Sequence, residues 1–254
     1  MSADALRTDV AGDIFESWRT ANGWKAKLAA DAERARCNQT RAQLRITKEV
    51  MERAIDDGAL AVALTGSTAR NRRTAISDLD YHVVGKRPDV SDLPAEVDVY
   101  ASSPERLWSK LRNGDDFIQW TLRCGCILFD TGIMREALGY LVTENLWPDA
   151  ESKLSRLPEL VRVADRLIRI GDCDAAQDQV RATLTAAARG LLLREHVFPL
   201  SRSELPDQLR STGRLEIALR LERSIHAELT LDELNDALEW GTSRNLSAAD
   251  STHR

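Results

Sequence analysis

The sequence has no apolar run long enough to cross a membrane and little excess charge of either sign. A membrane helix needs about 18 consecutive apolar residues, and no stretch of the 254 residues approaches that length. The 35 Lys and Arg residues stand against 40 Asp and Glu residues, which gives a formal net charge of -5. This balance provides no general field to hold nucleic acid, although a local basic patch is compatible with it. We therefore expect no membrane association, and nucleic acid is a disfavoured but open partner.

Cysteine is scarce, and its spacing excludes the common cysteine motifs. The four cysteines, Cys37, Cys124, Cys126 and Cys173, form no CxxC pair and have no histidine cluster nearby. A zinc site is therefore not expected, and reduced thiols are the default. Residues 1–7 show no basic stretch followed by an apolar run, the pattern of a secretory leader. These absences predict a cytoplasmic protein, and its 43% of hydrophobic residues suffice for a sizeable core.

The first 148 residues mix strand and helix patterns, and the rest of the chain is helical. Short apolar runs predict strands at residues 59–64, 79–84, 97–101 and 127–129. Helices are expected at residues 24–57, from Ser103, from Gly114 to about Cys124, and from about Gly132.

Beyond Pro148 only helical patterns follow, at residues 154–170 and 175–194, with capping-box spacings at Ser201-x-x-Glu204 and Thr230-x-x-Glu233. The sequence therefore predicts an α/β (α+β) chain in four parts. These are a helical segment (1–58), a small mixed-sheet domain (59–148), an all-helical bundle domain (149–241) and a disordered polar tail (242–254).

One window combines residues that indicate metal and phosphate chemistry. Gly66-Ser67 follows the first predicted strand, and Asp78-Leu79-Asp80 opens the second. Because strand side chains alternate between faces, Asp78 and Asp80 point the same way. Two like charges so close are unfavourable unless a cation lies between them, and carboxylate oxygens suit Mg²⁺.

A third carboxylate, Asp98, lies on the next predicted strand, where Val97 and Val99 would face the core. Three aspartates on adjacent strands could hold two Mg²⁺ ions about 4 Å apart, which would activate an attacking oxygen and stabilise a leaving pyrophosphate. Gly66 lets backbone N–H groups approach phosphate oxygens, and Ser67 adds a hydroxyl donor. Taken singly, each feature is equally well a turn or a solvated strand residue. Their order makes the combination specific.

Together these residues resemble the nucleotidyltransferase (polymerase-beta-like) superfamily, in which an apolar strand, Gly-Ser, a spacer of about ten residues and Asp-x-Asp follow in this order. The segment from Ala188 to Leu192, continuing to Pro206, is similar to the helical part of bacterial aminoglycoside adenylyltransferase-type members. The resemblance implies a mixed-sheet nucleotidyltransferase domain followed by a helical bundle domain.

The resemblance also implies roles for individual residues. Gly66 and Ser67 would hold the triphosphate, Asp78 and Asp80 would bind both metals, and Asp98 would bind the metal that activates the acceptor hydroxyl.

Two further candidates have competing interpretations. Arg70, in the spacer with Arg72 and Arg73, either contacts the triphosphate or belongs to a solvated loop. Asp116, nine residues before Gly125, matches a family segment in which a carboxylate followed by an aromatic residue is the base, although the family residue is a glutamate. Alternatively, Asp115 and Asp116 cap a helix.

The sequence predicts a Mg²⁺-dependent nucleotidyltransferase with two metal ions. It would move AMP from ATP to an acceptor hydroxyl, with release of pyrophosphate. A small molecule of aminoglycoside type is the expected acceptor. The alternatives are a protein or tRNA acceptor, as in toxin–antitoxin relatives, and a nucleotide-binding regulator without turnover. The exact acceptor, the preferred base and the oligomeric state are left open.

Overall fold

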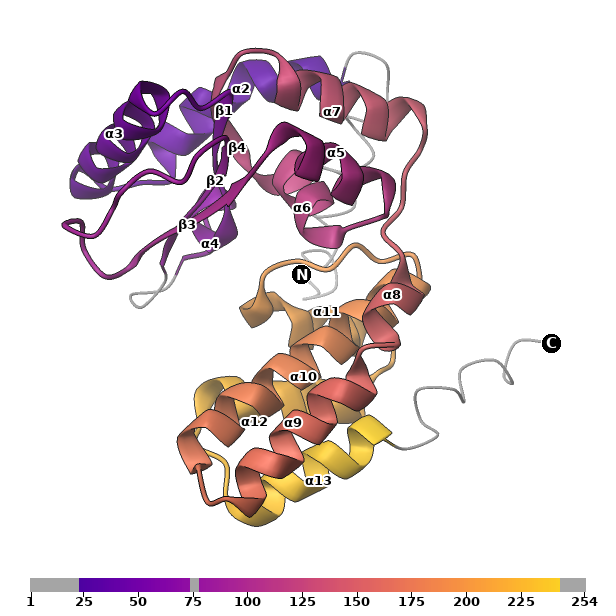
Figure 1. Ribbon diagram of the computed structural model, residues 1–254. Helices are drawn as coiled ribbons and strands as arrows, with labels where there is room; N and C mark the ends of the chain where they lie inside the picture. Colours follow the sequence, from indigo (N-terminus) through magenta and orange to yellow (C-terminus); the bar gives the residue numbers. More distant parts are fainter. Residues whose placement is uncertain (1–22, 74–77, 243–254) are drawn as a thin grey trace, which may run out of the picture. The chain divides into compact units, whose positions relative to one another are not determined.

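The computed structural model describes residues 23–73 and 78–242, and this part of the chain forms two compact units that divide between Pro148 and Asp149 (Figure 1). The first unit contains a four-stranded sheet with helices around it, and the described residues of the second unit contain helices but no strand. The predicted α/β class, with a helical region after it, is therefore confirmed. Among the described helices, none has the length and apolar character to span a membrane.

The sheet is mixed and has the order β3-β2-β1-β4. The central strand β1 (Ala61–Leu64) pairs antiparallel with β2 (Leu79–Val84) and with β4 (Cys126–Asp130). The edge strand β3 (Val97–Ser102) runs parallel to β2. All four residues of β1 are buried, as the continuous apolar run predicted. The four predicted strands are confirmed, with bounds that shift by at most two residues.

The helices of the first unit are α2 (Gly23–Cys37), α3 (Arg41–Asp56), α4 (Gly66–Ala69), α5 (Pro104–Arg112), α6 (Asp116–Cys124) and α7 (Ile133–Thr143). The prediction of one helix over residues 24–57 was wrong. Thr40 has extended backbone angles and forms a capping box with Gln43, which starts α3 as a new helix. The apolar spacing alone did not reveal this break.

Each face of the sheet is covered by a separate apolar cluster. On one face, Leu107 of α5 and Ile118 of α6 pack with Val84 of β2. On the other face, Val50 of α3 packs with Leu79 and with other buried residues of β1 and β2. Because Asp80 and Val84 have the same parity along β2, Asp80 is directed to the face that α5 and α6 cover.

The second unit consists of α8 (Ala150–Leu154), α9 (Leu157–Arg169), α10 (Cys173–Arg194), a 3-10 turn (Arg202–Glu204), α11 (Leu205–Ser211), α12 (Leu215–His226) and α13 (Leu231–Thr242). The helix predicted at 154–170 is confirmed as α9, which begins three residues later than predicted because the chain leaves α8 at Ser155 and Pro158 lies in the first turn of α9. The capping box predicted at Thr230 is present, and at Ser201 the carboxylate of Glu204 accepts the Ser201 amide at 3.3 Å. Residues 243–254 of the predicted tail lie outside the described residues, as do residues 1–22.

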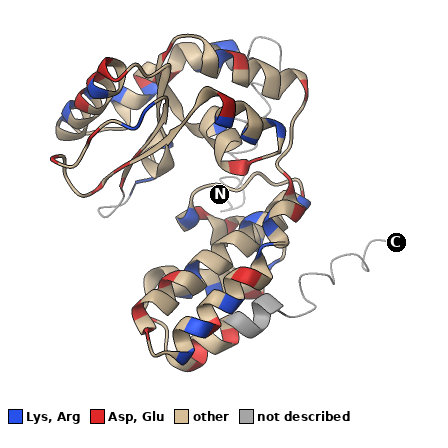
Figure 2. Ribbon diagram, viewed as in Figure 1, with Lys and Arg blue, Asp and Glu red and all other residues tan. Residues whose placement is uncertain are grey.

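Charge of both signs is mixed along the helices. In Figure 2, Lys and Arg segments alternate with Asp and Glu segments on α3 and on the helices of the second unit. Several of these charges form exposed helical pairs three or four residues apart, such as Lys48 with Glu52 and Arg220 with Glu216. Such pairs stabilise a helix by only about 0.2–0.5 kcal/mol each. The distribution agrees with the small net charge of -5.

Candidate functional site

The candidate site is built around the turn between β1 and β2. After β1 the amide of Thr65 donates to the carbonyl of Asp80 at 2.8 Å, and α4 begins at Gly66. Gly66 has φ +67° in the left-handed region, and a Cβ at this position would lie 1.9 Å from Asp80 Oδ2. Only glycine fits here, because any side chain would occupy the space of the carboxylate. The structure therefore brings Gly66 and Asp80, two residues predicted from sequence, into direct contact.

A buried threonine fixes α4 to the second strand. Thr68 is fully buried, and its Oγ1 donates to the carbonyl of Asp78 at 3.4 Å. The carbonyl of Ser67 accepts the amides of Arg70 at 3.2 Å and Arg72 at 2.9 Å. Sequence reasoning missed Thr68, since a hydroxyl residue two positions after Gly66 carries no signal of its own. Its role is to hold the Gly66–Ser67 backbone beside the acidic strand.

Asp80 has the most perturbed carboxyl group of the site. Burial, together with the charges of Asp78 and Asp98, raises the pKa of Asp80 to about 6. Asp78 is exposed at the start of β2. At neutral pH the ionised carboxylate of Asp80 is therefore unfavourable, and a bound cation would stabilise it.

Asp98 is the neighbour of Asp80 across the parallel β2–β3 pair. Its side chain is 72% exposed and lies 3.9 Å from the guanidinium of Arg87. In residues 23–73 and 78–242, no group of three or more His, Cys, Asp or Glu side chains is gathered closely enough to hold a metal ion. Mg²⁺ is usually bound through one or two carboxylates plus substrate phosphates. Asp78, Asp80 and Asp98 offer carboxylate oxygens, which are the type of ligand that Mg²⁺ prefers.

The arginines of the spacer have different surroundings. Arg73 donates from Nη1 to Oε1 of Gln43 at 2.6 Å, which ties the spacer to the start of α3. Arg70 follows α4 directly and is half-buried. The phosphate contact predicted for Arg70 stays a prediction, and residues 74–77 of the spacer lie outside the described residues.

Asp115 and Asp116 have separate roles at the start of α6. Asp115 is the N-cap, because its Oδ1 accepts the amide of Ile118 at 3.0 Å, and it also lies 3.2 Å from Lys110 Nζ. Asp116 is the first residue of the helix and is only 1% exposed. The capping interpretation is therefore confirmed for Asp115, and for Asp116 it stays a prediction. A base must come within hydrogen-bond reach of the acceptor hydroxyl, so Asp116 needs a path to that hydroxyl to act as one.

His82 lies on the same face of β2 as Asp80 and is fully buried. Its Nε2 is 2.9 Å from Ser102 Oγ, and its ring contacts those of Tyr100 and Phe117 at centroid distances of 5.1 and 5.7 Å. Burial lowers the pKa of His82 to about 4. At neutral pH it is therefore an uncharged packing residue next to the acidic strand.

The two central cysteines are packing residues as well. Cys124 and Cys126 are buried, and burial raises the pKa of both thiols to about 11. A thiol nucleophile needs a lowered pKa and access to solvent. The two thiols are therefore buried packing groups on either side of Gly125 in the chain.

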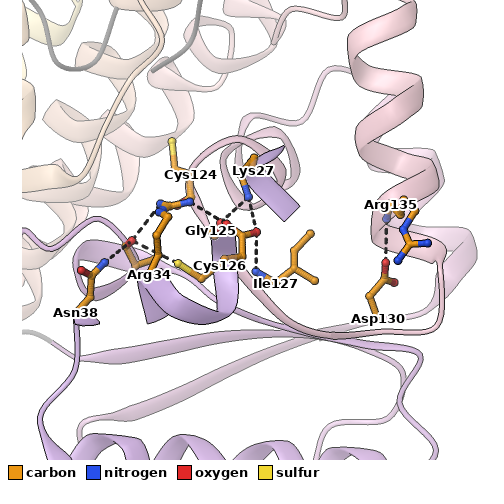
Figure 3. A network of polar contacts seen from close by, with 11 residues as sticks. Lys27, Arg34, Asn38, Cys124, Gly125, Cys126, Ile127, Asp130 and Arg135 are labelled. Carbon is orange, nitrogen blue, oxygen red and sulfur yellow. Dashed lines mark hydrogen bonds and ion pairs between the residues drawn. The ribbon is translucent and has the colours of Figure 1, made fainter. Parts of the chain in front are cut away.

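A buried ion pair on α2 lies against the junction between α6 and β4 (Figure 3). Asp31 is fully buried and accepts from Lys27 Nζ at 2.7 Å and from the amide of Ile127 at 3.1 Å. Lys27 Nζ also donates to the carbonyl of Gly125 at 2.8 Å. Sequence reasoning assigned no function to α2, because its partners lie almost 100 residues further along the chain.

Comparisons with known proteins find a resemblance among solved structures. No protein-family model and no curated protein matches the sequence. Among solved structures, this chain is similar to a nucleotidyltransferase-like protein from Exiguobacterium sibiricum 255-15, with 18% identity and a TM-score of 0.38 over 75% of this chain and 70% of that chain. A resemblance at this level assigns neither substrate nor site residues, so the function must be argued from the site itself.

Proposed function

We propose that this protein is a Mg²⁺-dependent nucleotidyltransferase. It would transfer a nucleoside monophosphate, AMP from ATP, to an acceptor hydroxyl and release pyrophosphate. The observation that carries the proposal is the contact between the backbone of Gly66 and the carboxylate of Asp80, with Asp98 next to it across the sheet. A turn without a side chain, next to the carboxylate of Asp80, suits a triphosphate that is bound together with a divalent cation.

The acidic residues would provide the cation site. Asp78, Asp80 and Asp98 would hold Mg²⁺, which when bound neutralises phosphate charge and helps to ionise the acceptor hydroxyl. Asp80 supplies a half-buried carboxylate whose pKa is raised to about 6. A bound cation would neutralise this unfavourable carboxylate charge. This favours binding of the metal together with its nucleotide.

The remaining residues would orient the nucleotide and accept a proton. Gly66 and Ser67 would present backbone amides and a hydroxyl to the triphosphate, with Arg70 supporting its charge. The acceptor oxygen would form a bond to the α-phosphorus while the bond to the pyrophosphate breaks. Asp116 is the candidate that receives the hydroxyl proton. Little covalent chemistry is required of the protein, so positioning provides most of the catalysis.

Labelled nucleotides provide the test. The protein is incubated with Mg²⁺, a cell extract and each nucleoside triphosphate labelled at the α-phosphate, and the labelled products are identified. Label transfer from α-labelled ATP, but not from γ-labelled ATP, is expected, because the monophosphate part moves. Asp80→Asn serves as the inactive control. Transfer of the γ-label would instead indicate a kinase, and equal labelling by Asp80→Asn would remove the carboxylates from the reaction. The labelled product would also distinguish an aminoglycoside-type acceptor from a protein or a tRNA.

A nucleotide-binding regulator without turnover is the second candidate. The near-complete burial of Asp116 favours it, because an enclosed carboxylate does not meet an acceptor. This candidate predicts binding of ATP with Mg²⁺ but no release of pyrophosphate with any acceptor in the extract.

A further inference from the structure

The carbonyl oxygen of Ala69, the last residue of α4, is held entirely by groups from other elements. It accepts from Arg34 Nη2 at 3.4 Å, from Asn38 Nδ2 at 3.0 Å and from Cys126 Sγ at 3.6 Å. A helix of four residues leaves its carbonyl groups without partners inside the helix. At the other end of α4, Thr65 makes no side-chain capping bond. The bonds of Thr65 and Thr68 hold α4 on β2, and the end of α4 is held by α2 and by the residues just after α2.

One guanidinium group connects α4 with α6. Nη2 of Arg34 lies 3.4 Å from the carbonyl of Ala69 and also 3.4 Å from the carbonyl of Cys124, the last residue of α6 (Figure 3). Its Nη1 donates to Asp31 Oδ1 at 2.8 Å. The planar fork of arginine presents donors in several fixed directions, which the single ammonium of lysine does not. Arg34 thus bridges the helix of the candidate phosphate turn and the helix that begins at Asp116.

Asp31 fixes the direction of this guanidinium. Asp31 is fully buried, and its second oxygen is occupied by Lys27 and the amide of Ile127. A buried carboxylate with three donors holds each of them with charge-assisted bonds. The junction after α6 is also tightly packed, because a Cβ on Gly125 would lie 2.5 Å from the carbonyl of Thr121 and 3.1 Å from that of Leu64.

We propose that Arg34 is a positioning residue of the nucleotide site. Held by Asp31, it fixes α4, and with it the backbone of Gly66 and Ser67, relative to α6. The identity of the ligand rests on the proposed function, but the positioning of α4 by Arg34 does not depend on it. Arg34 contacts neither the nucleotide nor the reacting atoms in this assignment. It acts through the carbonyl groups of Ala69 and Cys124.

The test compares Arg34→Ala and Arg34→Lys with Arg36→Ala, which removes an exposed ion pair with Glu33 from the same helix. Amide hydrogen exchange is followed over residues 65–72, and the affinity for ATP with Mg²⁺ is measured well below each melting temperature. Arg34→Ala should speed exchange in this segment and weaken ATP binding about 10- to 100-fold, the usual effect of losing a supporting contact. Arg34→Lys should restore only part of the affinity, and Arg36→Ala should match the wild type.

A second control separates positioning from general destabilisation. Met134→Ala truncates a fully buried side chain on α7 and lowers stability without touching the network. It should leave exchange in residues 65–72 and ATP affinity unchanged. Unaltered exchange or unaltered ATP affinity in Arg34→Ala would overturn the proposal. If Arg34→Ala does not fold, the same two measurements on Arg34→Lys decide. Wild-type protein that binds no ATP would overturn the proposed function instead, while exchange would still decide whether Arg34 holds α4.

Discussion

The carboxylate of Asp80 occupies the position that a side chain on Gly66 would need, because a Cβ on Gly66 would lie 1.9 Å from Oδ2 of Asp80. No real Cβ approaches an oxygen so closely, so a side chain at position 66 must displace either the turn or the carboxylate. The turn is fixed on β2 by Thr65 and Thr68, and Asp80 is fixed by its strand. A side chain at position 66 therefore cannot be added without moving one of these two residues.

The first prediction is that Gly66→Ala weakens ATP binding at least about tenfold, because displacing the turn or Asp80 misplaces the groups that receive the nucleotide. Gly58→Ala is the matched control, since Gly58 also has positive φ (+80°) but open space around a Cβ. Both variants carry similar backbone strain, of about 1–2 kcal/mol. Isothermal titration with ATP and Mg²⁺, alongside thermal melts, separates strain from displacement. Equal affinity in the two variants would contradict this account of Gly66.

The second prediction concerns the pH dependence of stability. The pKa of Asp80 is raised from 3.8 to about 6 in the folded protein. The folded state therefore binds the proton more tightly, so this group favours folding below pH 4 and loses that contribution as the pH rises through 6. Above pH 6 the full cost is up to about 3 kcal/mol. Asp80→Asn should consequently be more stable than the wild type at pH 7–8 and equal to it below pH 4.

Urea unfolding between pH 4 and pH 8, without divalent ions, measures this difference. Asp56→Asn, which removes an exposed carboxylate from the end of α3, is the control for a simple change of net charge. If Asp80→Asn were less stable than the wild type at pH 8, Asp80 would be a stabilising charge and the repulsion argument would be wrong.

The third prediction is that Asp78→Asn and Asp80→Asn each abolish pyrophosphate release while the protein stays folded. Both changes remove a carboxylate that would hold Mg²⁺, without changing the size of the side chain. Pyrophosphate is measured with the acceptor identified by labelling, at saturating Mg²⁺. Turnover at the wild-type rate in either variant would remove that residue from the metal site.

The fourth prediction separates two adjacent aspartates. Asp115→Ala removes the N-cap of α6 and should cost ~1 kcal/mol of stability with little effect on rate. Asp116→Asn should lower turnover about 10²–10⁴-fold with ATP binding intact, if Asp116 is the base. Melting temperature, ATP affinity and rate are compared for both variants. Normal turnover in Asp116→Asn would leave Asp116 a buried structural residue and would favour the regulator.

The fifth prediction tests the packing of the second unit. A Cβ on Gly190 of α10 would lie 2.5 Å from Leu154 Cδ2 of α8. Gly190→Ala should therefore destabilise this unit by about 1–3 kcal/mol through overpacking. Adding Leu154→Ala should recover part of that loss, since the two residues are in contact and their effects are not additive. Unfolding free energies of the two single variants and the double variant give the coupling. Strictly additive losses would show that the helices do not meet here.

The sheet was predictable from sequence because its strands are short apolar runs bounded by glycine, proline or charged residues. The run before Gly66 gave β1, and the alternation around Asp80 gave β2 with the correct face for its carboxylate. The break before α3 was not predictable from periodicity, because the apolar spacing continues across it. Thr40 reveals this break only through its capping partner, Gln43.

The candidate site also has residues that the sequence predicts and residues that depend on long-range packing. Gly66 and Asp80 follow from a local pattern, and their contact is produced by the hydrogen bonds between neighbouring strands. The burial of Asp116 depends on packing that no local pattern encodes. The α2 network is also absent from any local pattern, since Lys27 and Gly125 are 98 residues apart in sequence.

The β1–β4 pairing and the contact of Asp31 with Ile127 also set an order of events during synthesis. Asp31 must wait for an amide made 96 residues later, about 5–20 s at ordinary rates of translation. Until β4 has emerged from the ribosome, β1 has one exposed edge and Lys27 and Asp31 have only each other. Gly66, Ser67, Asp78, Asp80 and Asp98 are thus synthesised well before β4, but the site itself is completed only after β4 (Cys126–Asp130) has emerged from the ribosome.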